Sequence, residues 1–478
     1  MRNRSFLISG VVLLALAVCL HLFFYSRGFY SIGWDESGRT LDAYQWAAHG
    51  TILSGAWLPF YRVLIGLGLK VFPDLFLTPR ILTFLFGLAS IPAGAWLARE
   101  LFQNRKTTLL TLALSTFFSQ RLALSLAPLS DIMFIFVSLV TIALFTRWLR
   151  TYDRSALWAS ALFCALASTV RFEGWIFGCA IFLIAAGHYR FAPARLQRKD
   201  LLLFGLILFS FPVVWTVSTF SPATAVLAVV ADARQYSLRE ILRKNPLVEF
   251  VLTNAFTLNL IGMVAVLRFT RTGAWRDRAV VAASFAPLVA MSLGLLLMRS
   301  AQTGASWRMI AVWSMLLMPF TARFLTDSSW LLAGSRTGKV LASTAIVVVL
   351  SAFLYDTFRI ERNSAQWFPE SDRQAGRYLS DLIAANPDTR ILIESSRYFF
   401  LNILVASQHP DAFVRNSVPN QQSVPVLPRE GSVRNALANQ GIRFLVFRGD
   451  DYKSLLNQSL EVARLGDFGP WSIYKMAP

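Results

Sequence analysis

The chain has 478 residues, of which 55% are hydrophobic and only 15% charged, and its mean hydropathy is +0.50. Soluble proteins carry about 25% charged residues, so the composition excludes disorder, collagen and coiled coil and indicates a polytopic membrane protein. The net charge of +19 would suggest nucleic-acid binding in a soluble protein. Residues 358–478, however, hold 14 Lys/Arg and 12 Asp/Glu, so nearly all of the excess lies in the apolar part of the chain and reports topology.

Apolar runs recur from residue 6 to residue 357, and a run of about 20 residues crosses roughly 30 Å of hydrocarbon. Shorter runs suffice when they are packed inside a bundle. The first run follows Met-Arg-Asn-Arg and lacks a small-residue cleavage site, so we expect it to be retained as an anchor. Eleven spans are predicted, at 6–26, 79–98, 107–119, 131–147, 156–170, 174–188, 201–219, 249–267, 279–298, 309–325 and 339–356.

The charged residues between the spans predict the orientation. With the N-terminus in the cytoplasm, the loops on that side hold 19 Lys/Arg and 5 Asp/Glu, whereas the opposite loops hold 13 and 10. Cytoplasmic loops of membrane proteins carry an excess of Lys and Arg. An odd number of spans then places residues 358–478 on the outer face.

Two further segments do not fit as spans. Residues 57–73 carry Arg62, Lys70 and an aromatic cluster, which predicts a helix along the membrane interface within a long first outer loop, 28–78. Residues 231–247 are amphipathic and are also predicted to be interfacial, as a flap.

The chain is predicted to divide into a transmembrane module, 1–357, and an outer domain, 358–478, with ordinary soluble composition. Strands alternate with helices in the outer domain, which predicts a small α/β domain with a partly parallel sheet. No nucleotide-binding motif is found in it. The expected strands are 390–394, 442–447, 460–465 and 471–476, and the expected helices are 371–386 and 430–440.

Adjacent carboxylates follow the first span. Asp35 and Glu36 open the first outer loop, and two neighbouring acids are unfavourable to desolvate without a partner. They therefore mark either a polar cavity with a catalytic base, a cation site, or a solvated turn.

A third acid, Asp131, follows the second outer loop, which also carries Arg121. Asp131 lies at the start of the predicted fourth helix. It either complements that helix dipole as a first-turn acid, or completes a carboxylate pair with the first loop.

Two other outer turns carry arginine. Arg171 and Glu173 lie between the fifth and sixth spans, where they form either an ion pair that joins two short helices or one wall of a polar cavity. Arg308 begins the tenth span and is suited to bind a lipid phosphate through two hydrogen bonds, or else extends to the headgroups.

Histidine and cysteine contribute little chemistry. The four histidines are scattered without metal-ligand spacing, and the three cysteines, Cys19, Cys164 and Cys179, all fall in apolar runs. No GxSxG or HExxH motif is present. The remaining candidates for chemistry are carboxylates and arginines on one face of a helical bundle.

The order of these features resembles the GT-C glycosyltransferases that use polyprenyl-phosphate sugars, in particular the protein-mannosyltransferase and aminoarabinose-transferase-like group. The resemblance covers roughly residues 1–325. Its motifs, in chain order, are Asp35-Glu36, Trp57–Tyr61, Arg80–Phe102, Arg121–Ser125 with Asp131, and Trp307-Arg308 with Pro319.

The resemblance implies an inverting sugar transfer at the outer face of a bacterial inner membrane, with polyprenyl-phosphate sugar as donor. Asp35 would be the general base, Glu36 would support it, and Asp131 would orient the acceptor or a cation. Arg308 would hold the leaving phosphate. The predicted substrate-binding residues are Arg308, Arg121, Tyr61, Arg171 and Glu173.

Two other classes of protein are compatible with the sequence. A transporter or flippase of an anionic lipid-linked substrate would also use arginines at the outer face, although transporters usually place ionisable residues near the midplane. A scaffold whose outer domain binds a partner would leave Asp35 and Glu36 unexplained. The sugar, the acceptor (lipid, glycan or protein) and the need for a divalent cation, Mg²⁺ or Mn²⁺, are not determined by the sequence.

Overall fold

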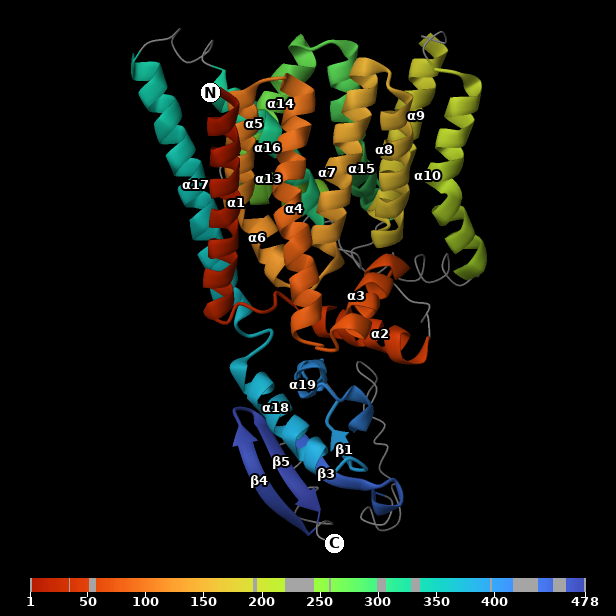
Figure 1. Cartoon of the computed structure of the whole chain (residues 1–478), viewed down its shortest axis with the longest axis vertical. Coiled ribbons are helices and arrows are strands. Elements are labelled where there is room, and N and C mark those ends of the chain that lie inside the picture. Colours follow the sequence, from red (N-terminus) through yellow and green to blue (C-terminus); the bar gives the residue numbers. More distant parts are fainter. Residues whose placement is uncertain are drawn as a thin grey trace. The chain divides into compact units, whose positions relative to one another are not determined.

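The structure is a computed structural model, and most of the chain is helical (Figure 1). It describes residues 2–33, 35–50, 57–191, 196–219, 245–257, 259–298, 307–327, 336–395, 398–415, 437–449 and 461–476. The chain forms two compact units. Unit 1 comprises Met1–Phe24, Leu53–Tyr61 and Thr83–Ile360, and unit 2 comprises Tyr25–Ile52, Arg62–Leu82 and Glu361–Pro478.

Unit 1 is a bundle whose long helices run side by side (Figure 1). Every predicted span coincides with one helix or with a pair of helices. The helices are α1 (Arg2–Ser26), α4 (Leu77–Phe102), α5 (Arg105–Phe117), α6 (Ser119–Leu126), α7 (Ser130–Thr151), α8 (Arg154–Val170), α9 (Glu173–Phe191), α10 (Arg198–Thr219), α13 (Pro246–Phe256), α14 (Leu260–Thr272), α15 (Trp275–Met298), α16 (Trp307–Thr326) and α17 (Arg336–Ser364).

The number of spans differs from the prediction. Among the described residues, six helices are long and apolar enough to cross a membrane, or eight if each of two bent helix pairs counts as one span. The predicted count of eleven is therefore not confirmed. Of the remaining predicted spans, the one at α8 is an apolar helix of only 17 residues.

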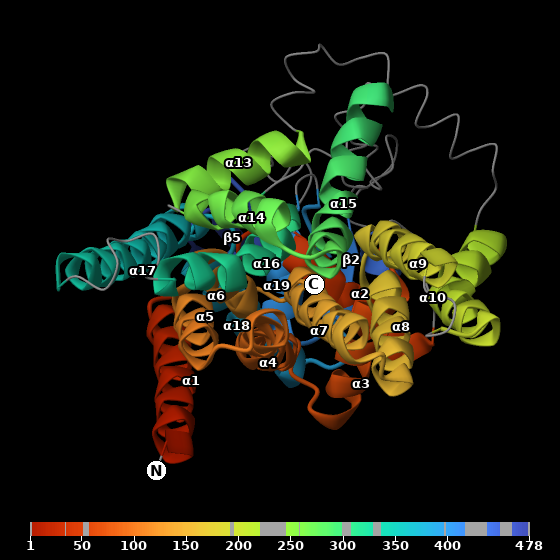
Figure 2. The same ribbon diagram turned by 90° about the horizontal axis from the view of Figure 1, so that it is seen from above.

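The bundle has a buried centre and an apolar periphery. In α7 and α16 most side chains are buried, and α7 packs against α8, α15 and α16 (Figure 2). Helices α1 and α10, at the periphery of the bundle, expose large apolar side chains instead, among them Leu7, Leu206 and Val217. Such an apolar surface is typical of helices that face lipid.

Two predicted spans are broken. Helices α5 and α6 meet at 51°, where Phe118 has an extended backbone conformation. Helices α13 and α14 meet at 115°. There, Asn259 donates to Asn254 Oδ1 at 2.7 Å and accepts from Thr321 of α16 at 2.8 Å. The span predicted at 249–267 is thus formed by two helices, and these side-chain hydrogen bonds satisfy polar groups at the break.

The last turns of three helices meet at one end of unit 1. Glu100 near the end of α4 pairs with Arg150 near the end of α7 at 2.7 Å. Phe102 of α4 packs on Phe320 of α16, with ring centroids 5.7 Å apart. The first turns of α7 and α16 consequently lie toward the opposite end of this unit.

Unit 2 contains a five-stranded sheet of order β2-β1-β3-β5-β4, formed by β1 (Arg390–Ile393), β2 (Phe413–Arg415), β3 (Ile442–Arg448), β4 (Val462–Phe468) and β5 (Trp471–Met476). Strand β1 pairs in parallel with β2 and β3, and β5 pairs antiparallel with β3 and β4. The predicted partly parallel sheet and its four strands are confirmed. Strand β2 was not predicted, because three residues are too few for a pattern to show.

Helices complete unit 2. The prediction of 371–386 is confirmed as α18 (Glu370–Ala385), whereas α19 (Phe400–Ser407) was missed because its eight residues are nearly all apolar and lack a helical period. The predicted helix 430–440 is described only from residue 437, and residues 231–244 of the predicted flap lie outside the described residues.

The segment after the first span folds with the C-terminal residues. It supplies α2 (Asp35–His49) and most of α3 (Pro59–Val71) to unit 2. Ser37 of α2 donates to Asn402 of α19 at 2.8 Å, and Arg62 of α3 pairs with Asp42 of α2 at 2.5 Å. The helix predicted within 57–73 is confirmed, and its place at a membrane interface stays a prediction.

A buried carboxyl group predicts how the stability of unit 2 depends on pH. Asp372 accepts hydrogen bonds from Asn402 and from the indole of Trp471, both at 2.8 Å, and burial raises the pKa of Asp372 above its usual value. The folded unit therefore binds the proton more tightly than the unfolded chain does. The stabilising contribution is complete at low pH and is lost as the pH rises through the raised pKa.

We expect the amides of β5 to lose protection against hydrogen exchange, corrected for intrinsic rates, as the pH is raised above the usual pKa of an aspartic acid, about 3.9. Asp372→Asn should remove this dependence, and Asp388→Asn, at an exposed position of the same unit, should keep it. An unchanged profile in Asp372→Asn would contradict the assignment.

Candidate active site

Three charged side chains meet where α7 begins and α8 ends. The Arg171 guanidinium lies between two carboxylates: Nη1 is 2.8 Å from Asp131 Oδ1, and Nη2 is 2.5 Å from Glu173 Oε1. The arginine side chain is 14% exposed and the two acids 5% and 7%. The Arg171–Glu173 ion pair is thus present, and the same guanidinium also pairs with Asp131.

Local backbone geometry positions this cluster. Helix α8 ends at Val170, Arg171 is extended (φ −148°, ψ 148°), and α9 starts at Glu173. At Gly174 a Cβ would lie only 2.6 Å from the carbonyl carbon of Ala167, so the close approach of α9 to the end of α8 requires glycine. The tight turn directs Arg171 back toward the first turn of α7.

Tyr61 and Arg121 both bind backbone carbonyl groups. The Tyr61 hydroxyl donates to the carbonyl of Pro128 at 2.5 Å and so contacts the loop that leads into Asp131. Arg121 is 2% exposed and donates to the carbonyls of Thr116, at 2.9 Å, and Gly87. These contacts give Arg121 a structural part at the bend between α5 and α6, and its predicted substrate contact stays a hypothesis.

Arg308 lies in the first turn of α16 and is half-buried. The last turn of α16 lies with the last turns of α4 and α7, and a helix of 20 residues is about 30 Å long. Arg308 therefore lies toward the same end of unit 1 as Asp131.

Asp35 and Glu36 belong to unit 2, in the first turn of α2. Glu36 is 1% exposed and accepts a hydrogen bond from the backbone N–H of Ile32 at 2.8 Å. Asp35 is half-buried. Two acids in the first turn of a helix interact favourably with the helix dipole. Because Glu36 is buried, the alternative of a solvated turn is wrong for this residue.

One buried acid was missed by the sequence interpretation. Asp356 of α17 is 1% exposed, accepts from the hydroxyl of Ser119 at 2.6 Å and pairs with Arg359 at 2.7 Å. A lone carboxylate at the end of an apolar run was the signal that could have found it. Its hydrogen bond with Ser119 joins α17 to the start of α6.

No group of three or more His, Cys, Asp or Glu side chains in the described part of the chain is arranged to hold a metal ion. The divalent cation left open by the sequence stays a hypothesis. The grouped charges instead offer two carboxylates and a fixed guanidinium within one cluster, which can orient a polar ligand.

No protein-family model matches the chain. No curated protein matches it in sequence. Solved structures of GT-C glycosyltransferases do match it, so the chain has the GT-C fold that its resemblance predicted.

Three of these structures are informative. ArnT from Cupriavidus metallidurans, bound to undecaprenyl phosphate, is 12% identical with a TM-score of 0.65, over 98% of this chain and 99% of that one. The oligosaccharyltransferase AglB from Archaeoglobus fulgidus, in complex with an inhibitory peptide and a dolichol-phosphate, is 12% identical with a TM-score of 0.53, over 95% and 70%. The arabinofuranosyltransferase AftD from Mycobacteria is 16% identical with a TM-score of 0.53, over 100% and 42%.

Proposed function

We propose that this protein is a membrane glycosyltransferase that moves a sugar from a polyprenyl phosphate to an extracytoplasmic acceptor with inversion at the anomeric carbon. The observation that carries the proposal is the shared fold with ArnT over almost the full length of both chains. That protein was solved with undecaprenyl phosphate, a polyprenyl phosphate. A donor of this kind is already activated and arrives from the bilayer, so a nucleotide site is not required.

Asp35 is proposed as the general base. Its carboxylate takes the proton from the acceptor hydroxyl while the oxygen attacks the anomeric carbon from the face opposite the phosphate. The bond between the anomeric carbon and the phosphate oxygen breaks, and the electron pair leaves with the polyprenyl phosphate. Glu36, fixed through the Ile32 amide, supports the position of Asp35.

Asp131 is proposed to orient the acceptor, and its ion pair with Arg171 keeps the carboxylate in place. Arg308 is proposed to bind the phosphate, where negative charge grows as the bond breaks. A guanidinium is suited to this task because its planar donors match two phosphate oxygens.

We further propose a bacterial plasma-membrane location, with the N-terminus in the cytoplasm and residues 358–478 outside. The uneven distribution of Lys and Arg over the loops supports this orientation. In this orientation the donor and the acceptor would both be bound on the outer side of the membrane.

Sugar transfer itself is the test. Membranes containing the protein, and matched membranes without it, are supplied with radiolabelled polyprenyl-phosphate sugars, and label on outer-face acceptors is measured. We expect protein-dependent label with release of polyprenyl phosphate. Passage of intact labelled lipid across the bilayer without transfer would contradict the proposal and favour a transporter.

A further inference from the structure

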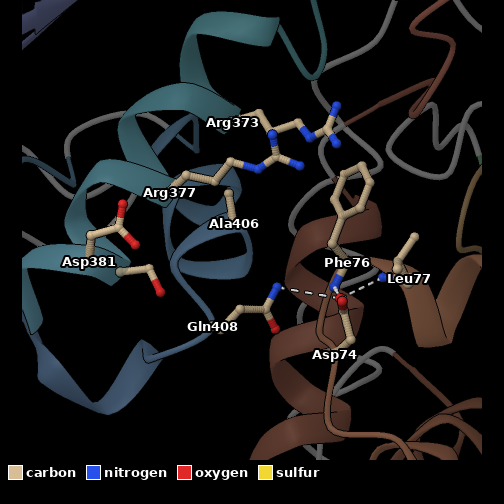
Figure 3. A pocket seen from close by; sticks show the side chains of 9 residues that line it. Asp74, Phe76, Leu77, Arg373, Arg377, Asp381, Ala406 and Gln408 are labelled. Atoms are coloured by element: carbon tan, nitrogen blue, oxygen red, sulfur yellow. Dashed lines mark hydrogen bonds between the residues drawn. The ribbon is translucent and has the colours of Figure 1, made fainter. Parts of the chain in front are cut away.

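Unit 2 contains a second candidate site, a cavity of about 370 Å³ that is lined by charged and amide side chains (Figure 3). Arg373, Arg377 and Asp381 come from α18. Asp74 lies just ahead of α4, and Gln408 directly follows α19. All of these residues belong to one compact unit, and none of them has a part in the transfer step proposed above.

Two arginines form the basic side of the cavity. Arg373 and Arg377 lie one turn apart on α18, and both side chains extend toward Phe76 (Figure 3). Arg373 is oriented by a hydrogen bond to the Tyr30 hydroxyl at 3.1 Å and lies 5.2 Å from the centre of the Phe76 ring. Arg377 is exposed and makes no hydrogen bond or ion pair with another residue in the described part of the chain. Its guanidinium donors are therefore available to a ligand.

The opposite wall is built with a hydrogen-bond network between distant segments. Gln408 accepts from the Leu75 amide at 2.7 Å. Asp74 Oδ1 accepts from the amides of Phe76 and Leu77, each at 2.8 Å (Figure 3). Gln408 adopts a left-handed conformation (φ 63°), which is uncommon for this residue type. These hydrogen bonds join the end of α19 to the segment ahead of α4, and Asp74 Oδ2 has no hydrogen-bond partner among the described residues.

The mixture of charges selects the ligand. Two guanidinium groups bind an oxyanion, either phosphate or carboxylate. Asp74 and Asp381 on the other sides accept hydrogen bonds from hydroxyl groups and repel a compact polyanion. The cavity volume lies near the lower end of the range of about 300–1,000 Å³ for small-molecule sites. A single sugar ring that carries one anionic group meets all of these conditions.

We infer that this cavity binds an anionic sugar unit, a pyranose-sized ring bearing a carboxylate or a phosphate, as part of the acceptor. The assignment of this sugar to the acceptor rests on the proposed function. The binding of the sugar in the cavity does not depend on that function. The arginines of α18 hold the anionic group, and the carboxylates of Asp74 and Asp381 hold ring hydroxyls. The cavity would thereby select acceptors that carry negative charge.

The test uses the purified full-length protein in detergent and measures equilibrium binding of four probes: galacturonate, glucose 6-phosphate, glucose and inorganic phosphate. We expect the two anionic sugars to bind at least tenfold more tightly than glucose or phosphate. Arg377→Gln should weaken their binding by about 10- to 100-fold, because a charge-assisted hydrogen bond is lost. Arg443→Gln is the matched control, since Arg443 is an exposed arginine of β3 outside the cavity, and it should bind as the wild type.

Several results would overturn the inference: absence of binding by both anionic sugars, equal binding by Arg377→Gln, or equal affinity for inorganic phosphate. A transfer assay separates this inference from the proposed function. Arg377→Gln should raise the KM for acceptor and leave kcat unchanged. Wild-type binding without any transfer would remove the proposed function and keep the cavity site, whereas normal transfer without binding would remove the site alone.

Discussion

Asp35→Asn is expected to lower sugar transfer by about 10²–10⁴-fold, the usual contribution of a general base. The asparagine amide has nearly the shape of the carboxylate but cannot take the proton of the acceptor hydroxyl. The rate is measured with labelled donor at saturating acceptor, with equal amounts of protein in each sample. The effect should fall on kcat, because Asp35 is proposed to act in the chemical step.

Asp388→Asn is the matched control for Asp35→Asn. Asp388 is an exposed aspartate of unit 2 on the turn before β1, and its replacement changes the net charge equally. We expect wild-type transfer from it. Equal rates for Asp35→Asn and the wild type would show that another group is the base.

Arg171→Met is expected to destabilise the protein by about 3–5 kcal/mol, the usual effect of removing one partner of a buried ion pair. It leaves Asp131 and Glu173 buried next to each other without their shared counter-charge. The midpoint of thermal unfolding in detergent should fall clearly. Transfer should also decrease, since the Asp131 carboxylate is no longer held.

Two further variants separate charge from packing at Arg171. The triple variant Arg171→Met, Asp131→Asn, Glu173→Gln should regain most of the stability, because it contains no uncompensated charge, while remaining defective in transfer. Arg147→Met is the control, since the Arg147–Asp153 pair is exposed and such pairs contribute only about 0–1 kcal/mol. An unfolding midpoint that Arg171→Met does not lower would mean that the pair contributes little to the fold.

Much of the fold could be predicted from local patterns. Long apolar runs of helix-forming residues indicated helices wherever a span was expected, because a backbone in lipid must satisfy its hydrogen bonds within the segment. Strands such as Ile442–Arg448 were indicated by consecutive β-branched and aromatic residues. The bends were missed, because Asn254 and Asn259 look like isolated polar residues until their partners on α16 are known.

The candidate site was only partly predictable. Asp131, Arg171 and Glu173 were each selected as unusual charges beside apolar runs, but the sequence did not show that one guanidinium holds both acids. Their grouping depends on the close approach of α8 and α9 at Gly174. Asp356 was not selected, although its position at the end of an apolar run was visible in the sequence.

By itself, the sequence determined that this is a helical membrane protein, where its helices lie, that the C-terminal domain contains a sheet, and which charged residues have potential for chemistry. These follow from hydrophobic period, run length and charge, which are local properties of the chain. Only the tertiary structure decided that α2 and most of α3 fold with the C-terminal residues, and that Asp74 and Gln408 share a cavity with the arginines of α18. The hydrogen bonds Ser37–Asn402 and Leu75–Gln408 join residues that are 365 and 333 positions apart, and no local pattern specifies a partner at that separation.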